Sequence, residues 1–162
     1  MKSIINSHNR NFCKNGQLSA KPCNCRRQPC PMDGECRANA IVYKATVTTD
    51  DGDTKDYLGS TENDFKVRHA NHKSSFKNQH LRSATRLSQY IWKLKEEGKP
   101  SEIKWKLQYQ SRPYKCGTRK CDLCISEKLE ILRSDPLKTL NRRSEIANKC
   151  KHRSKHKLGN LK

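Results

Sequence analysis

With 162 residues, 32% of them hydrophobic and 31% charged, the chain has room for one compact domain with a modest core. Its formal net charge is +19, and so many like charges repel one another in the compact state. The excess therefore indicates a polyanionic partner, most often nucleic acid. A solubilising basic tail and an anionic membrane surface are the alternatives. No stretch approaches the ~18–20 apolar residues that span a bilayer, so no membrane partner is expected.

The sequence divides into four segments of different composition. Residues 1–22 are polar and predict a linker, and residues 23–38 form a cysteine-rich segment with prolines and a glycine. Residues 39–145 have the pattern of a folded unit, and residues 146–162 form a basic tail with Cys and His. The amino terminus has too short an apolar run for a secretory signal, so a reducing compartment is expected. There, nine cysteines indicate metal binding rather than disulfides.

Alternating side chains predict the strands of the folded unit. Residues 40–47 alternate apolar and polar side chains, Asp51-Gly52 supplies a hairpin turn, and residues 55–60 return as a second strand. Residues 103–109 alternate in the same way and predict a third strand.

Three helices are expected around these strands. The first begins near Asp64 and has one face formed by Phe65, His69, His72 and Phe76. The second covers residues 85–97, with a stripe of Leu87, Ile91 and Leu94 and with Gly98 as its stop. The third covers residues 122–133 and ends before Asp135-Pro136. This order predicts an α/β fold of the α+β type, with a small three-stranded antiparallel sheet flanked by helices.

Four side chains of the first strands and helix suit the hydrolysis of a phosphodiester. That reaction needs a water that loses its proton, a divalent cation and a positive group on the phosphate. Tyr43 and Tyr57 lie on adjacent strands of one hairpin, and Arg68 and His72 share a helix face. The spacing alone does not decide their role, because strand tyrosines are usually core residues and surface arginines are usually solvated.

Taken together and in order, the signals resemble the GIY-YIG nucleases. The matching residues are Ile41-Val42-Tyr43, Tyr57-Leu58-Gly59, Arg68, Glu127 and Asn141, and His72 lies where several members place a histidine. The first motif departs from the family pattern because Ile41 stands where the glycine is expected.

The resemblance implies a role for each matching residue. Glu127 would hold one divalent cation, Mg²⁺ or Mn²⁺, and Arg68 would hold the scissile phosphate. Tyr43 would deprotonate the water directly or as a relay, with Tyr57 in the same site and Gly59 and Asn141 in support. Tyrosine, with a pKa near 10, is a poor base at neutral pH, so its pKa must be shifted by the cation and the arginine, or His72 must act as a second base. Glu130 is an alternative to Glu127 because both lie on one helix face.

The cysteine motifs extend the resemblance to the endonuclease domain of Penelope-like retroelements. The motifs are Cys23-Asn24-Cys25, Cys30 to Cys36, Cys121-x-x-Cys124 and Cys150-x-His152. In such elements the domain follows a reverse transcriptase, and residues 1–12 resemble the end of that upstream region. The resemblance therefore implies a nuclear DNA endonuclease that nicks or cuts target DNA for integration. It also implies that the chain is a truncated or domesticated piece. The alternative is a catalytically inactive zinc- and DNA-binding remnant.

Two sets of cysteines are candidate zinc sites. Cys23, Cys25, Cys30 and Cys36 are separated by turn residues and suit tetrahedral Zn²⁺. Cys121 and Cys124, closed by Cys150 and His152, form a second candidate set, in which Cys116 is an alternative fourth ligand. Unligated cysteines remain the alternative for both sets.

Basic side chains predict DNA binding without base reading, because such groups contact phosphates and give salt-dependent affinity. The candidates are Lys104, Lys106, Arg119, Lys120, Arg142 and Arg143. A disulfide-rich extracellular binder is the third class of protein considered, but the odd cysteine count fits it poorly. Target sequence and oligomeric state stay open.

Overall fold

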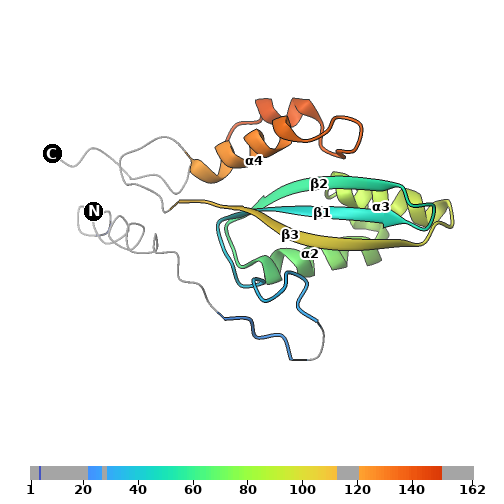
Figure 1. Ribbon diagram of the computed structural model, residues 1–162, viewed down its shortest axis with the longest axis horizontal. Coiled ribbons are helices and arrows are strands. Elements are labelled where there is room, and N and C mark those ends of the chain that lie inside the picture. The colour runs from blue at the N-terminus through green and yellow to red at the C-terminus, as the bar shows by residue number, and fades with distance from the viewer. Residues whose placement is uncertain (1–3, 5–21, 27–28, 113–120, 151–162) are drawn as a thin grey trace.

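The computed structural model describes residue 4 and residues 22–26, 29–112 and 121–150. Its elements follow one another in the predicted order of hairpin, two helices, strand and helix (Figure 1). They are β1 (Ile41–Thr49), β2 (Thr54–Thr61), α2 (Phe65–Lys77), η1 (Gln79–Leu81), α3 (Arg86–Glu96), β3 (Ser101–Gln110), α4 (Asp122–Arg133) and η2 (Arg143–Ala147).

The three strands form one antiparallel sheet in the order β2-β1-β3, so the prediction of a small three-stranded sheet is confirmed. In the register of the hairpin, Tyr43 lies opposite Gly59 and Ala45 lies opposite Tyr57. The strands extend one or two residues beyond the predicted ends, except that β1 begins one residue later than predicted. They extend because polar residues such as Thr48 continue the backbone ladder without alternating in hydropathy.

Helices cover both faces of this sheet. On one face, α2 and α3 pack against fully buried side chains of β1, and Phe65 and Leu87 are fully buried there (Figure 1). On the other face, α4 packs against β2 and β1. β2 is an edge strand, so the elements on the two faces approach each other around its free edge.

Helix α3 has the stripe and the stop that the sequence predicted, but it begins one residue later. Thr85, predicted as its first residue, is its N-cap and accepts a hydrogen bond from the Ser88 amide at 3.0 Å. Leu87, Ile91 and Leu94 form its buried stripe. Gly98, at φ +67°, follows the helix in the left-handed region that favours glycine.

A segment after α4 extends the sheet beyond β2. Thr139 forms an isolated parallel bridge with Asp56, whose amide donates to the Lys138 carbonyl at 2.8 Å. The Leu140 amide in turn donates to the Asp56 carbonyl at 2.7 Å. These bonds place the segment beside the β2 edge, and η2 follows it directly. Among the described residues, no helix has the length and apolar character needed to cross a bilayer.

Candidate functional site

The hydroxyl of Tyr43 joins two of the predicted site residues. The tyrosine is fully buried, and its Oη accepts a hydrogen bond from Nε of Arg68 at 2.9 Å. The same Oη lies 2.8 Å from Nε2 of His72. Arg68 can only donate, and the phenol proton of Tyr43 is donated to His72 when the neutral imidazole carries its proton on Nδ1. The helix α2 thus places Arg68 and His72, four residues apart, on either side of one strand hydroxyl.

The pKa values of this group keep both His72 and Tyr43 uncharged at neutral pH. Burial, with smaller contributions from Arg68 and His69, lowers the pKa of His72 to about 3, so the imidazole is neutral at pH 7. Burial also raises the pKa of Tyr43 to about 12, although Arg68 acts in the opposite direction. Burial therefore opposes both routes that the sequence left open. It raises the pKa of Tyr43, and it makes His72 a weak base at neutral pH.

We expect the buried His72 to make folding stability depend on pH. Its pKa is about 3 in the folded chain against an ordinary value of 6.5, so the unfolded state binds more protons between these values. Stability therefore falls as the pH drops below 6.5, by about 2 kcal/mol between pH 7 and pH 5 for this one group. Urea unfolding of wild type and of His72→Gln at these two pH values measures the difference. The pKa of His69 is lowered in the same direction, so part of the dependence should remain in the variant.

The control for this experiment is His80→Gln, because His80 lies exposed on η1. It should leave the pH dependence of the free energy of unfolding at the wild-type value. Equal pH dependence in wild type and His72→Gln would show that the buried imidazole does not titrate as inferred.

Gly59 leaves the space that the Tyr43 hydroxyl occupies. A Cβ atom built on Gly59 would lie 2.6 Å from Oη and 2.8 Å from Cζ of Tyr43, and 3.0 Å from Cε1 of Tyr57. Distances below 3.0 Å require a shift of neighbouring atoms. The glycine of the Tyr-x-Gly motif therefore has a packing reason here. The position where the first motif lacks a glycine is taken by Ile41, which is fully buried in the core.

A cleft of about 540 Å³ lies at the β2 edge, between the elements that cover the two sheet faces. Tyr57, Arg68 and Glu127 all line it, so the structure brings these three predicted residues together. Tyr43 and His72 are buried behind Arg68 rather than in the lining. Its lining also includes residues that no sequence motif predicted: Ser60, Ser83, Ala84, Thr85, Arg86, Gln89, Lys128, Ile131, Glu145 and Asn148.

The structure separates Glu127 from its alternative Glu130. Glu127 is half-buried in the cleft. Burial of the two phenols is the main cause that raises the pKa of Tyr43 and Tyr57, and the negative charge of Glu127 adds to it. Glu130 instead lines a second hollow of about 240 Å³ and pairs with Arg133 at 3.0 Å. Glu127 is therefore the carboxylate of α4 that faces the predicted site.

Asn141 has a positioning role in this arrangement. Its side chain is buried and pairs with the β2 backbone at Leu58, accepting from the amide at 2.7 Å and donating to the carbonyl at 2.9 Å. Its Nδ2 also donates to Oε2 of Glu145 at 3.1 Å. The amide thereby fastens the segment before η2 to the strand that carries Tyr57, and it holds Glu145 at the cleft.

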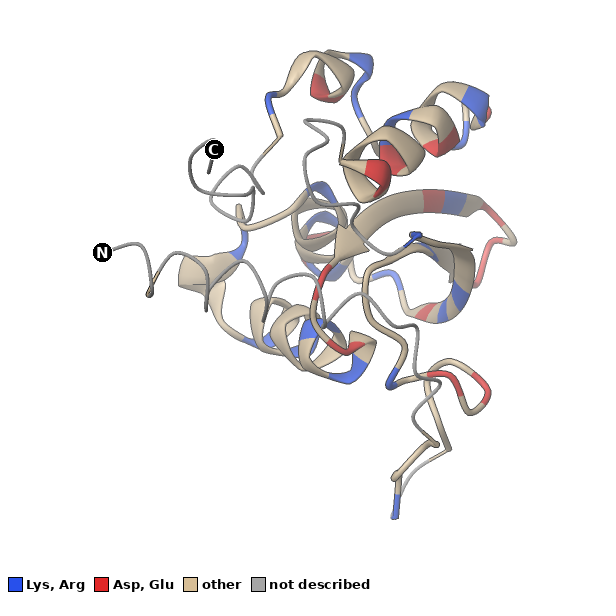
Figure 2. Cartoon of the chain, turned by 90° about the vertical axis from the view of Figure 1, so that its left-hand side faces the viewer, with Lys and Arg blue, Asp and Glu red and all other residues tan. Residues whose placement is uncertain are grey.

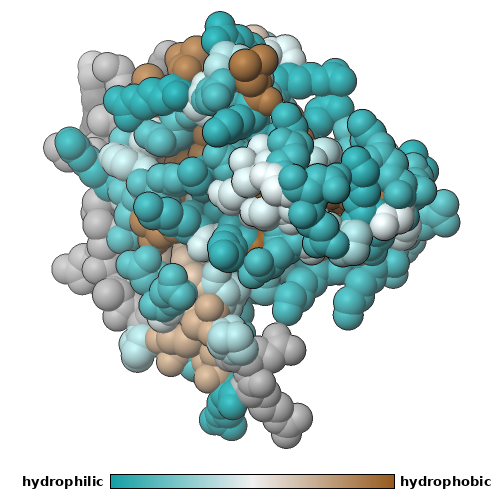
Figure 3. All heavy atoms as spheres, turned by 45° about the vertical axis from the view of Figure 1, so that its right-hand side comes forward, coloured by the Kyte–Doolittle hydropathy of each residue, from teal (hydrophilic) through white to brown (hydrophobic). Residues whose placement is uncertain are grey.

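The predicted DNA-binding residues lie outside the cleft lining. Lys104 and Lys106 are exposed on β3, the opposite edge strand, and Arg142 and Arg143 are exposed at η2. Lys and Arg are spread over helices and sheet rather than gathered on one element (Figure 2), and the face in Figure 3 is mostly hydrophilic. The sequence also predicted DNA contacts and zinc ligation by three residues outside the described ranges: Arg119, Lys120 and His152.

Four cysteines before β1 form a cluster that could hold zinc. The Sγ atoms of Cys23, Cys25, Cys30 and Cys36 all lie within 4.8 Å of one another. Sγ of Cys36 is 3.6 Å from that of Cys23 and 3.7 Å from that of Cys25. Tetrahedral zinc with Zn–S bonds of about 2.3 Å spaces its sulfurs about 3.8 Å apart, whereas a disulfide needs about 2.05 Å. The four thiols therefore fit tetrahedral zinc, and we name them the N-terminal cluster.

The backbone around Cys30 favours its thiolate form. Burial acts to raise the pKa of Cys30, but backbone amides of Met32, Gly34 and Cys36 donate to its sulfur and lower the pKa to about 7. Thiolates are the form of cysteine that binds metal. This arrangement fits a ligand that is fixed in place before the metal binds.

A second set of three thiols, named here the α4 cluster, also could hold a metal. The Sγ atoms of Cys121, Cys124 and Cys150 lie within 4.8 Å of one another, and those of Cys124 and Cys150 are 3.4 Å apart. Cys124 also lines the cleft, one turn before Glu127. Lys128 adds a tie between α4 and the segment after η2, because its Nζ donates to the Asn148 carbonyl at 2.7 Å. The predicted fourth ligands, His152 or Cys116, lie outside the described ranges.

Comparison with known proteins assigns no family to this chain. No family model matches it, and neither a curated protein nor a solved structure does. A function for the chain therefore has to be argued from its own residues.

Proposed function

We propose that this protein is a metal-dependent DNA endonuclease of the GIY-YIG type, which hydrolyses phosphodiester bonds. The observation that carries the proposal is the convergence of Tyr57, Arg68 and Glu127 on one cleft, directly in front of the hydrogen-bonded pair Tyr43 and His72. A cation-binding carboxylate, a phosphate-binding arginine and a proton acceptor are the groups that this hydrolysis requires.

Arg68 is the residue that we assign to the scissile phosphate. The guanidinium lines the cleft, where it is hydrogen-bonded to Tyr43 and Tyr57, and its five N–H groups exceed these two bonds and suit phosphate oxygens. Its charge persists at every relevant pH, because its pKa is raised further above the usual value by the tyrosines despite burial. The bond to Tyr43 fixes its orientation before substrate arrives.

Tyr43 and His72 form a hydrogen-bonded pair behind the cleft, with Oη of Tyr43 2.8 Å from Nε2 of His72. Tyr43 would take the proton of the attacking water only as phenolate, and its pKa of about 12 means that the charges of Arg68 and of a cation on Glu127 would have to stabilise that phenolate. His72, with a pKa of about 3, would act as a neutral hydrogen-bond partner that orients Tyr43 rather than as the base. Tyr57 lines the cleft itself and supplies the tyrosine hydroxyl that can contact the substrate.

Glu127 is the residue that we assign to a divalent cation. Mg²⁺ binds hard oxygen ligands, commonly one or two carboxylates together with substrate phosphate and water, and a carboxylate in a polar cleft fits that preference. A cation there, Mg²⁺ or Mn²⁺, would offset the negative charge that develops on the phosphate. The zinc-type cysteine clusters lie apart from this role, since thiolates prefer softer metals.

The cysteine motifs support a place within the Penelope-like retroelements. On that resemblance the substrate is target DNA in the nucleus, and the partner is a reverse transcriptase encoded upstream. Lys104, Lys106, Arg142 and Arg143 are exposed cations that suit contacts with DNA phosphates beyond the cleft. Such contacts give salt-dependent binding with little base discrimination.

Cleavage of supercoiled plasmid tests the proposal. Wild type with Mg²⁺ is expected to produce relaxed or linear DNA, and EDTA should stop the reaction. Arg68→Ala should lower the rate by at least about a hundredfold, because it removes a donor to the charge of the transition state. Arg82→Ala is the matched control, since Arg82 is exposed, pairs with Glu96 at 3.4 Å and lies outside the cleft.

Gel shifts run beside this assay separate binding from cleavage. If the wild-type protein binds plasmid but leaves it intact with Mg²⁺ and with Mn²⁺, the nuclease proposal is wrong. The chain would then be the alternative that the sequence left open, a zinc- and DNA-binding remnant.

A further inference from the structure

The N-terminal cluster is built into the fold rather than attached to it. Cys36 is fully buried, and Met32, two residues after Cys30, is 2% exposed and belongs to the hydrophobic core beneath the sheet. The segment enters β1 directly at Ile41 (Figure 1). The position of the cluster is therefore coupled to the packing of the domain.

The backbone of this segment caps the helix that carries Arg68 and His72. The first amides of a helix lack partners within the helix and need acceptors from outside it. In α2 the Phe65 amide donates to the Ala38 carbonyl at 2.9 Å, and the Lys66 amide donates to the Cys36 carbonyl at 2.7 Å. A residue of the cluster thus supplies one of the acceptors that begin α2.

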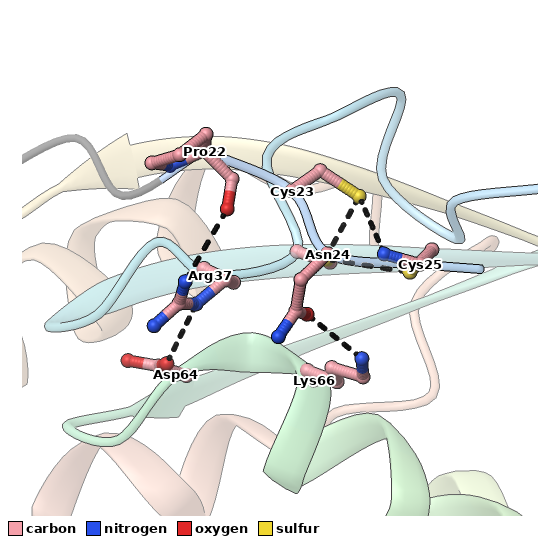
Figure 4. Close-up of polar contacts among 8 residues, drawn as sticks. Pro22, Cys23, Asn24, Cys25, Arg37, Asp64 and Lys66 are labelled. Atoms are coloured by element: carbon pink, nitrogen blue, oxygen red, sulfur yellow. Dashed lines mark hydrogen bonds and ion pairs between the residues drawn. The ribbon is translucent and has the colours of Figure 1, made fainter.

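Two side-chain contacts join the same parts. Nε of Arg37 pairs with Oδ2 of Asp64 at 3.6 Å, and Asp64 is the N-cap residue of α2 although its side chain makes no cap hydrogen bond. Nζ of Lys66 donates to Oδ1 of Asn24 at 2.9 Å, and Asn24 lies between Cys23 and Cys25 (Figure 4). Backbone and side chains therefore hold the first turn of α2 against the cluster.

Apolar burial contributes little to holding α2 on the sheet, because of its thirteen residues only Phe65, His72 and Ser75 are buried. Its later turns are joined to the rest of the fold by polar contacts of His72 with Tyr43 and of Ser75 with Ser88 and Trp92. Arg68 is its fourth residue, immediately after the capped turn, and its bond to Tyr43 depends on where that turn lies. A displacement at the cluster would reach Arg68 within one helical turn.

We propose that the N-terminal cluster, loaded with zinc, positions the first turn of α2 and through it Arg68. The cluster residues act as positioning residues, because they contact neither the cleft nor Tyr43. The inference rests on the proposed function only in treating Arg68 as a phosphate ligand. The positioning itself concerns the protein without DNA.

Hydrogen exchange on Cys25→Ser tests this directly. The substitution removes a ligand that is half-exposed, so it should lower zinc content without opening the core. The amides of Lys66 and Val67 are expected to exchange at least about tenfold faster than in wild type, while the amides of α3 keep their protection. Cys121→Ser is the matched control, because it lowers metal content at the α4 cluster and should leave the α2 amides unchanged.

A spectroscopic signal and a rescue distinguish positioning from general loss of structure. The Trp105 ring lies 5.4 Å from Phe65 and 5.3 Å from His69, so its fluorescence reports on the first turns of α2. In a Trp92→Phe background, where Trp105 is the remaining tryptophan, Cys25→Ser should change the emission spectrum. Cys25→His, which keeps a zinc-binding side chain, should restore both the spectrum and the slow exchange.

Three outcomes would overturn the inference. The first is wild-type exchange at Lys66 and Val67 in a Cys25→Ser protein that has lost zinc. The second is faster exchange in α3 as well, which would mean that the metal holds the whole domain. The third is a protein that binds no zinc at this cluster. Since cleavage is not measured, this inference and the nuclease proposal can fail independently.

Discussion

Replacing Glu127 with glutamine is expected to reduce plasmid cleavage by about a thousandfold while the protein stays folded. The carboxylate lines the cleft with Tyr57 and Arg68, where a cation would supply several kcal/mol of charge stabilisation in the transition state. Glutamine keeps the size of the side chain but removes the charge that attracts the cation. The rate of loss of supercoiled plasmid, measured over a range of Mg²⁺ concentrations, gives the effect.

Glu130→Gln is the matched control for this prediction. Glu130 lies one turn further along α4, in the second hollow, and pairs with Arg133. Cleavage by this variant should stay close to wild type, because its carboxylate does not reach the cleft. If the two substitutions have equal effects, the assignment of the cation to Glu127 is wrong, and a common effect on the stability of α4 explains both.

The choice between these two glutamates shows where sequence reasoning stops. They lie three residues apart on one helix, so helical periodicity assigns them to the same face. Which of them meets Arg68 depends on how α4 crosses β2 and β1, and that crossing is set by contacts between residues far apart in the sequence. The bond between the Leu58 amide and Asn141, 83 residues apart, is one of them.

The elements of the fold were predictable where their signals are local. Helix α3 has an apolar stripe, a capping threonine and a terminal glycine, and the structure uses all of them. Helix α4 has the predicted bounds, Asp122–Arg133. Its end was predictable because the Asp135-Pro136 pair that follows it cannot continue a helix. The start of α2 is different, since its amides are satisfied by the carbonyls of Cys36 and Ala38 rather than by a neighbouring side chain.

The site was predictable only in its motif residues. Tyr57, Arg68 and Glu127 were predicted from a resemblance to a family pattern, and the cleft brings them together. Residues such as Arg86 and Lys128 line the same cleft without any pattern in the sequence. They arrive there because the loop before α3 and the face of α4 meet around the β2 edge, which is a consequence of packing and not of local propensity.

Replacing Gly59 with alanine is expected to damage both the fold and the site. The new Cβ would lie 2.6 Å from Oη of Tyr43 in a fully buried position. The ring has no easy way to move, because its hydroxyl is bonded to His72 on one side and to Arg68 on the other. Overpacking of this kind costs about 1–3 kcal/mol of folding stability. Displacement of Oη would also break its two bonds to Arg68 and His72, and with them the orientation of Arg68, so cleavage should fall with stability.

A double-mutant cycle with Tyr43→Phe separates this steric cause from a general weakness of the strand. Phenylalanine removes the oxygen that the Cβ meets at 2.6 Å and leaves the contact to Cζ at 2.8 Å, so Gly59→Ala should cost less stability in that background than in wild type. Urea unfolding of the four proteins measures the coupling. Strictly additive free energies would mean that alanine disturbs β2 itself, and that Gly59 is not in this fold to make room for the tyrosine hydroxyl. A positive coupling would instead tie the glycine of the second motif to the tyrosine of the first, through a contact that their cross-strand register creates.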